Sequence, residues 1–334
     1  MSQRADLAAA FVATTDWAGA LLRPLASDAG KRAYFRLISP AGHKAVLMDA
    51  SPEKGEDVRP FLTIDRWLTG QGLSAPEIYA EDTANGFLLI EDLGDGLYAR
   101  LADQDAALEQ PIYEAAIDAL LEITTAEPPT VDPYDAETMA PLAGLAGSWY
   151  AGDAALAEEI ARATGRALAS LAPAPPTLAL RDFHAENLLW LPDRKGAARV
   201  GLLDFQDARR GHPAYDVASL LRDARRDVPQ RLQTILADRF GAGLGWDRDE
   251  TTRALAVQGA QRNLRILGVF ARLSLHFSKP HYVDLIPRVW QNLQTELSHP
   301  DLTELRQVAS QLPTPSTPHL QDLKDRCGTI PTLA

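Results

Sequence analysis

The sequence has a single cysteine, Cys327, among its 334 residues. A lone cysteine excludes an intrachain disulfide and a cysteine-based zinc cluster, and it is typical of proteins in a reducing compartment. Long apolar runs are also missing. The longest uncharged stretches, such as 138–152, contain proline and glycine and are shorter than the roughly 20 residues that span a bilayer. We therefore predict a cytoplasmic protein that does not span a membrane.

Positive charge is scarce as well: 33 Lys and Arg face 45 Asp and Glu, for a net charge of -12. This balance argues against a general nucleic-acid binder, which usually presents a basic face. The remaining composition, 46% hydrophobic and 23% charged residues, is that of an ordinary globular protein. We expect a small-molecule substrate, with no nucleic-acid, membrane or obligate protein partner.

The stretch 178–216 places polar side chains at the ends of short apolar segments. One apolar segment leads to Asp182, Asn187 follows five residues later, and a strand-like run then leads to Asp204. Phosphoryl transfer from a nucleotide needs a carboxylate at the acceptor hydroxyl and hard oxygen ligands for Mg²⁺. We predict that Asp182 is the catalytic base and that Asn187 and Asp204 hold the metal.

An aspartate after an apolar run is more commonly a helix cap or a turn former, so the first pair alone is weak evidence. The order of the whole stretch is more specific, because Gly211 and Asp216 follow before another apolar run. This order resembles the catalytic and metal-binding signature of the aminoglycoside phosphotransferase family, the small-molecule branch of the kinase-like fold. One departure is Leu180, where that family usually has histidine as a scaffold residue.

The resemblance implies an α+β, bilobal protein-kinase-like fold. Residues 1–93 would form a small nucleotide-binding lobe around an antiparallel sheet, and residues 94–334 a larger helical lobe, with the active cleft between them. ATP and Mg²⁺ would be the cofactors. Asp216 would be the structural aspartate that braces the catalytic loop.

A small, polar and basic segment ends at Arg32 and precedes a predicted hairpin with strands at 33–38 and 45–48. In kinase-like folds such a segment covers the nucleotide phosphates with backbone N–H groups and cations. A plain surface hairpin is the alternative interpretation. By the resemblance, the nucleotide phosphates would be bound by Ser27, Gly30, Lys31, Arg32 and Lys44.

Kinases carry a phosphate-binding lysine on the second of these strands, but this sequence has Met48 there. Another cation must then contact the phosphates. Glu56 is a possible partner for it, although an exposed acid in the first turn of a helix is the commoner role. The candidate cations are Lys31, Arg32, Arg36 and Lys44.

Further elements follow from apolar periodicity and turn residues. We predict helices at 5–22 and 53–68, a strand from 75, and a turn at Asn85-Gly86 before an apolar strand. That strand ends near Glu91 and Leu93, which by the resemblance would belong to the adenine-binding hinge. Later helices are predicted at 112–123, 154–171, 217–224, 230–237 and 251–275, followed by a loosely packed tail from 311.

Other stretches are similar to the bacterial anomeric N-acetylmuramate/N-acetylglucosamine kinases of cell-wall recycling. They are the hairpin at 33–38, the segment 261–273 and the segment 279–290. This resemblance implies phosphorylation of the C1 hydroxyl of the sugar, with Arg181 and His184 as substrate contacts beside Asp182. A carboxylate-bearing sugar would also need a cation, for which the candidates are Arg181, Arg209, Arg262 and Arg265.

Three other functions remain open at this point. An aminoglycoside kinase would need an acidic wall for its polycationic substrate. A choline or ethanolamine kinase would need an aromatic cage or its equivalent around the amine. A relic that only binds nucleotide is allowed by the absent strand lysine, although such a protein has no reason to keep Asp182, Asn187 and Asp204 together.

Overall fold

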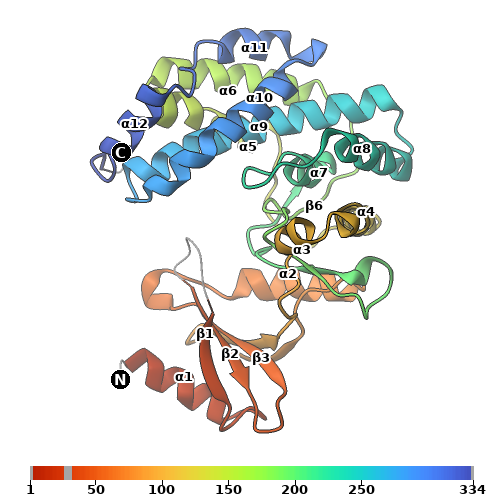
Figure 1. The fold of residues 1–334 in the computed structure, drawn as a ribbon, viewed down its shortest axis with the longest axis vertical. Helices are drawn as coiled ribbons and strands as arrows, with labels where there is room; N and C mark the ends of the chain where they lie inside the picture. The colour runs from red at the N-terminus through yellow and green to blue at the C-terminus, as the bar shows by residue number, and fades with distance from the viewer. Residues whose placement is uncertain (1–2, 26–31, 332–334) are drawn as a thin grey trace. The chain divides into compact units, whose positions relative to one another are not determined.

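The computed structural model describes residues 3–25 and 32–331. The chain divides into two compact units (Figure 1), which we call the sheet unit (1–115 with 186–207) and the helical unit (116–185 with 208–334). The prediction divided the chain at 93/94. Residues 94–115 and 186–207 belong to the sheet unit because they pack there, although they follow the sheet in sequence.

The sheet unit contains an antiparallel five-stranded sheet with the strand order β1-β2-β3-β5-β4. The predicted strands at 33–38 and 45–48 are confirmed, and they pair so that Tyr34 lies opposite Met48. The strands are β1 (Leu21–Leu25), β2 (Ala33–Ile38), β3 (Lys44–Asp49), β4 (Ile78–Asp82) and β5 (Phe87–Glu91).

The helix predicted at 5–22 is wrong in its second half, because α1 ends at Ala13 and β1 begins at Leu21. The Thr14 and Thr15 hydroxyls donate to the carbonyls of Phe11 and Val12 in the turn that ends the helix. β1 is an edge strand, which is where a strand tolerates a proline such as its Pro24.

The turn before β5 depends on Gly86, which has φ 72 and whose Cβ, if present, would lie 2.0 Å from the Ala50 carbonyl oxygen. The rest of the sheet unit is built from helices and a small hairpin. They are α1 (Gln3–Ala13), η1 (Pro52–Lys54), α2 (Arg59–Gly70), α3 (Tyr98–Gln104), β7 (Leu188–Trp190), η3 (Gly196–Arg199) and β8 (Val200–Leu202); α4 (Ala106–Ile123) belongs partly to each unit.

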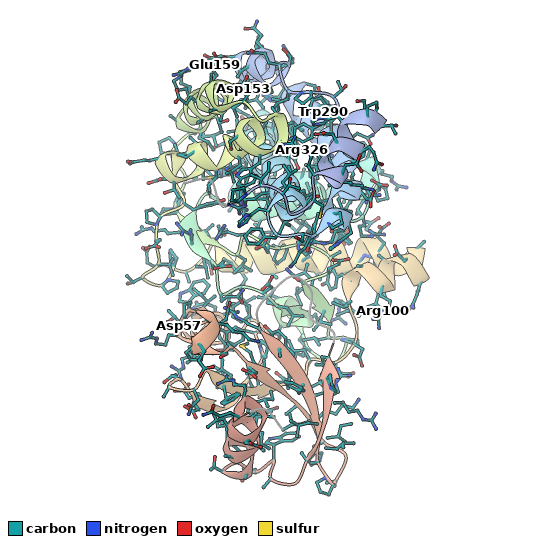
Figure 2. The ribbon with its side chains drawn as sticks, turned by 90° about the vertical axis from the view of Figure 1, so that its left-hand side faces the viewer. Asp57, Arg100, Asp153, Glu159, Trp290 and Arg326 are labelled. Atoms are coloured by element: carbon teal, nitrogen blue, oxygen red, sulfur yellow. The ribbon has the colours of Figure 1, made fainter. Side chains whose placement is uncertain are left out.

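The helical unit is organised around α9 (Arg248–Leu275), most of which is buried. Figure 1 shows α9 among its neighbours α5, α7 and α10. Asp153, labelled in Figure 2, caps α6 by accepting a hydrogen bond from the Leu156 N–H at 3.0 Å. The other elements are α5 (Ala136–Ala143), η2 (Ala146–Ala151), α6 (Ala154–Ala169), β6 (Thr177–Ala179), β9 (Arg209–Gly211), α7 (Ala214–Leu221), α8 (Gln230–Leu244), η4 (Pro280–Leu285), α10 (Ile286–Leu297), η5 (Pro300–Leu302), α11 (Thr303–Ala309) and α12 (Thr317–Asp325).

The tail predicted to be loosely packed is instead partly folded onto the helical unit. α12 forms within it, Leu312 and Leu323 are buried, and the Ser274 hydroxyl donates to the Leu323 carbonyl at 2.8 Å. The prolines and threonines that suggested disorder stand at the start of this helix, where proline is well tolerated. Across the described ranges, none of the helices is long and apolar enough to cross a membrane.

Candidate active site

The β7–β8 hairpin brings Asn187 and Asp204 to the same end of one small element. β7 begins at Leu188, directly after Asn187, and β8 ends at Leu202. The Leu203 N–H donates to the Asn187 carbonyl at 3.0 Å, which continues the pairing one step beyond the strands. The amide and the carboxylate predicted to hold a metal are therefore presented by adjacent backbone at the open end of this hairpin.

Asp204 is exposed and adopts a left-handed backbone conformation, with φ 57. A non-glycine residue in this region is strained unless its surroundings hold it there. The next residue supplies such support, because the Phe205 ring is buried and stacks on Phe61 of α2 at a centroid distance of 4.7 Å. Gln206 also donates to Asp204 Oδ1 at 2.8 Å.

This donor set fits Mg²⁺. The ion prefers carboxylate and carbonyl oxygens and usually keeps several waters and phosphate oxygens in its shell, so one or two protein ligands suffice. Asp204 and Asn187 are side chains of that kind, and the exposed carboxylate of Asp204 leaves room for the remaining ligands.

Arg32 and Glu56 form an ion pair within the sheet unit. The Nε of Arg32 lies 2.7 Å from Oε2 of Glu56, and their side chains are 15% and 18% exposed. Tyr34 lies beside them: burial raises the pKa of its hydroxyl, Arg32 opposes this rise, and the charge of Asp204 adds to it. Tyr34, which contacts the Arg32–Glu56 pair, thus lies within electrostatic reach of the predicted metal ligand Asp204.

The other candidate phosphate cations have different surroundings. Arg36 pairs with Asp92 at 2.6 Å and with Asp95 at 3.0 Å, so it braces the segment that follows β5. Lys44 is exposed at the start of β3. Met48 is 1% exposed, so its side chain is part of the core. Ser27, Gly30 and Lys31 lie outside the described residues.

The predicted hinge residues lie at the end of β5. The Glu91 carboxylate binds Arg194 of the β7–β8 turn at 2.5 Å, and its backbone N–H donates to the Glu77 carbonyl at 2.8 Å. The Glu91 side chain is therefore engaged in holding the β7–β8 hairpin to the sheet. Leu93 is half-buried and lies close to Gly201 of β8.

In the helical unit, Asp216 of α7 holds the segment that leads to Asp182. Its two carboxylate oxygens accept the backbone N–H groups of Leu180 at 2.6 Å and of Arg181 at 2.8 Å. Burial raises the pKa of Asp216 to about 7, and these two hydrogen bonds oppose the rise. Arg181 has φ 74, a strained conformation that the two bonds help to maintain. This is the contact expected of the structural brace.

His184 follows Asp182 but is only 5% exposed. Burial lowers its pKa to about 4; the charge of Asp223 opposes this and that of Arg225 adds to it. The ring is therefore neutral at neutral pH, and its Nε2 lies 3.3 Å from Nη1 of Arg225. Because an arginine can only donate, this Nε2 accepts the bond, and His184 acts as a brace for the loop.

Sequence reasoning missed a pair of tyrosines beside the loop. The hydroxyls of Tyr134 and Tyr215 lie 3.4 Å apart, and Arg265 Nη1 donates to the Tyr215 hydroxyl at 3.2 Å. The guanidinium carbon of Arg181 lies 5.1 Å from the centre of the Tyr134 ring. The one hint of this pair in the sequence is that Tyr215 directly precedes Asp216, the predicted structural aspartate.

Arg209, another candidate cation for a substrate carboxylate, lies 3.9 Å from the Asp132 carboxylate.

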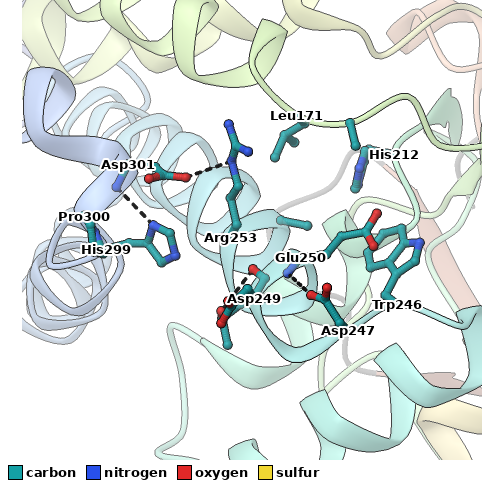
Figure 3. A pocket seen from close by; sticks show the side chains of 13 residues that line it. Leu171, His212, Trp246, Asp247, Asp249, Glu250, Arg253, His299, Pro300 and Asp301 are labelled. Atoms are coloured by element: carbon teal, nitrogen blue, oxygen red, sulfur yellow. Dashed lines mark hydrogen bonds and ion pairs between the residues drawn. The ribbon is translucent and has the colours of Figure 1, made fainter.

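A separate cavity of about 650 Å³ opens in the helical unit (Figure 3). It is lined by His212, Trp246, Glu250 and Arg253, among others, and by none of the predicted site residues. His212 accepts a hydrogen bond from the Ala214 N–H through Nδ1 at 3.2 Å, so it shapes the turn before α7.

Kinase-like phosphotransferases use a cation paired with an acid, oxygen-bearing side chains for a metal, and a catalytic aspartate loop. This chain has residues of each type: the Arg32–Glu56 pair, the hairpin end with Asn187 and Asp204, and the loop before Asp182 that Asp216 holds. The chain belongs to the phosphotransferase enzyme family, whose model matches residues 21–254. It is a small-molecule kinase with the predicted α+β kinase-like fold.

Two relatives are similar over most of their length. An N-acetylmuramate/N-acetylglucosamine kinase of Caulobacter vibrioides is 38% identical, covering 91% of this chain and 95% of that protein. An enzyme of the same name from Pseudomonas aeruginosa is 32% identical, covering 87% and 88%.

Solved structures are similar in fold. A choline/ethanolamine kinase family protein from Mesorhizobium loti has a TM-score of 0.65 at 15% identity, covering 97% of this chain and 100% of that one. An aminoglycoside phosphotransferase from Streptomyces rimosus, in complex with ADP and streptomycin, has a TM-score of 0.53 at 19% identity, covering 79% and 98%.

Proposed function

We propose that this enzyme transfers the γ-phosphoryl group of ATP to the anomeric hydroxyl of N-acetylmuramate or N-acetylglucosamine. The observation that carries the choice of sugar is the 38% identity to a kinase of that name over 91% of the chain. The braced loop before Asp182 supports the phosphoryl-transfer chemistry.

In this proposal Asp182 accepts the proton of the C1 hydroxyl. The sugar oxygen forms a bond to the γ-phosphorus while the bond between that phosphorus and the β–γ bridging oxygen breaks, and ADP leaves. An anomeric hydroxyl is more acidic than an ordinary alcohol, so a carboxylate is a sufficient base. Asp216 keeps the backbone of the loop in its strained conformation, so that the position of Asp182 is set before substrate binds.

Asn187 and Asp204 would hold Mg²⁺, which supplies neutralising charge for the β- and γ-phosphates. Arg32 would contact the phosphates in place of the absent strand lysine. Its pairing with Glu56 is the arrangement that kinases use to hold their lysine. A guanidinium has five N–H donors in a planar fork, so its bonds to Glu56 and Tyr34 leave further donors for phosphate oxygens.

The test is a coupled ADP-release assay with N-acetylmuramate, N-acetylglucosamine, an aminoglycoside, choline and ethanolamine, each with and without Mg²⁺. We expect release with the two sugars alone, only with Mg²⁺, and a product whose NMR spectrum places phosphate on C1. Release with choline or an aminoglycoside in preference to the sugars, or phosphate at another position, would refute the proposal.

Asp182→Asn and Asp204→Asn test the assigned roles. We expect the activity of each to fall by a factor of about 10² to 10⁴, the usual contribution of a positioned base or charge. Asp193→Asn is the matched control, because Asp193 is exposed in the β7–β8 turn. It should retain full activity.

A further inference from the structure

Three arginines of the helical unit gather around the tyrosine pair: Arg181, Arg262 and Arg265, which we call the arginine corner. Arg181 lies over the Tyr134 ring, and Arg265 donates to the Tyr215 hydroxyl. Arg262 is one turn before Arg265 on α9 and therefore on the same helix face. Its charge affects the pKa of Tyr215 and of Asp216. This protein is acidic overall, so three cations in one place need an explanation.

The corner lies within electrostatic reach of the proposed base. The charge of Asp182 contributes to the raised pKa of Arg265, together with the Tyr215 and Tyr134 hydroxyls and against the effect of burial. Arg265 is not fully buried as a residue, and its guanidinium donates a hydrogen bond from Nη1 to the Tyr215 hydroxyl. A ligand whose hydroxyl reaches Asp182 is therefore near the cation of Arg265.

Arg262 is incompletely satisfied by the protein. Its side chain is 4% exposed, and neither Nε nor Nη1 has a hydrogen-bond partner among the described residues. Burying a cation is costly when its N–H donors lack acceptors. That cost falls when an anion approaches the corner, since an opposite charge favours the charged form of each arginine.

We propose that the arginine corner binds the carboxylate of an acidic sugar acceptor and thereby makes the enzyme favour anionic over neutral or cationic acceptors. The inference rests on the proposed function. N-Acetylmuramate differs from N-acetylglucosamine by an O3 lactyl ether, which ends in a carboxylate. Arg265 makes the direct contact, because Tyr215 orients its guanidinium and the residue is less buried than Arg262. Arg262, one helical turn away, adds positive potential.

A test with altered substrates requires no mutation. The kcat and KM of the unmodified enzyme are measured for N-acetylmuramate, for its methyl ester and for N-acetylglucosamine. A hydrogen-bonded ion pair is worth about 1.5–3 kcal/mol, or roughly 10- to 100-fold in binding. We expect the ester to lose about that factor in kcat/KM, mainly through KM. Equal kcat/KM for acid and ester would overturn the inference.

Arg265→Met tests the residue itself. We expect KM for N-acetylmuramate to rise roughly 10- to 100-fold, while KM for N-acetylglucosamine changes less than about threefold. Arg253→Met is the matched control on the same helix, because Arg253 pairs with Asp301 at 3.0 Å away from the corner. It should leave both KM values unchanged.

The outcomes separate this inference from the proposed function. If the unmodified enzyme phosphorylates neither sugar, the proposed function fails. If it phosphorylates both and Arg265→Met raises both KM values equally, the proposed function stands and the carboxylate contact is refuted. Arg265→Lys keeps the charge without the planar fork, so it should recover part of the loss if the contact is an ion pair.

Discussion

Arg32 Nε lies 2.7 Å from Glu56 Oε2, and this pair joins the segment before β2 to the segment before α2. The strand position that usually carries the phosphate-binding lysine is occupied by buried Met48. In the proposed function, Arg32 at the start of the neighbouring strand takes the place of that lysine and Glu56 is its acidic partner.

Arg32→Met should lower kcat/KM for ATP by about two orders of magnitude, the usual loss when one preorganised charge at the transferring group is removed. Glu56→Gln should cost about tenfold, since it loosens Arg32 without removing the cation. Steady-state kinetics with varied ATP measure both. Arg66→Met, which breaks an exposed pair with Glu81, is the control and should be fully active. Normal activity of Arg32→Met would assign the phosphate contact elsewhere.

Asp216→Asn should impair both the loop and the fold. An asparagine amide offers one acceptor oxygen, so it keeps one of the two backbone bonds and places an N–H₂ group against the other N–H. A buried donor left without its acceptor costs about 1–3 kcal/mol. Thermal unfolding should show that loss, and kcat should fall about a hundredfold because Arg181 is no longer held at φ 74. A loss of stability with unchanged kcat would separate the brace from catalysis.

His212 should make the protein sensitive to mild acid. Burial lowers its pKa to about 4 in the folded state, whereas the unfolded chain takes up the proton near pH 6.5. Stability from this group is therefore present above pH 6.5 and lost as pH falls toward 4. His212→Asn should become more stable relative to the unmodified protein by about 2 kcal/mol between pH 8 and pH 5, measured by urea unfolding. His43→Asn, at an exposed turn, should show no such trend.

Asp65 should give the protein a pH dependence of stability opposite to that caused by His212. Its side chain is 1% exposed, its Oδ2 has no hydrogen-bond partner among the described residues, and burial raises its pKa to about 7. Because the unfolded carboxyl loses its proton near pH 4, the folded state loses stability as pH rises from 4 to 7. Asp65→Asn should raise the free energy of unfolding by about 4 kcal/mol at pH 8 and by only about 1.5 kcal/mol at pH 5. An equal effect at both values would contradict this assignment.

Several elements of the fold followed from local patterns. The strand 33–38 alternates, the turn at Gly86 needs a residue that tolerates φ 72, and the helix predicted at 251–275 lies within α9. The predictions were wrong where contacts between residues far apart in the sequence determine the local structure. The second half of the helix predicted at 5–22 became β1 because the edge of β2 offered it a partner. The tail packs against the helical unit because Leu323 is buried and its carbonyl accepts a hydrogen bond from the Ser274 hydroxyl.

The sequence by itself determined the family, the order of Asp182, Asn187, Asp204 and Asp216, and the absence of a strand lysine, because each depends on residue type and spacing along the chain. Only the tertiary structure selected Arg32 as the cation paired with Glu56 and brought Tyr134, Tyr215 and the arginines of α9 together. Such ion pairs and ring contacts join residues separated by 24 to 81 positions. Their formation depends on which side chains folding brings within a few ångströms, and spacing in the sequence does not specify that.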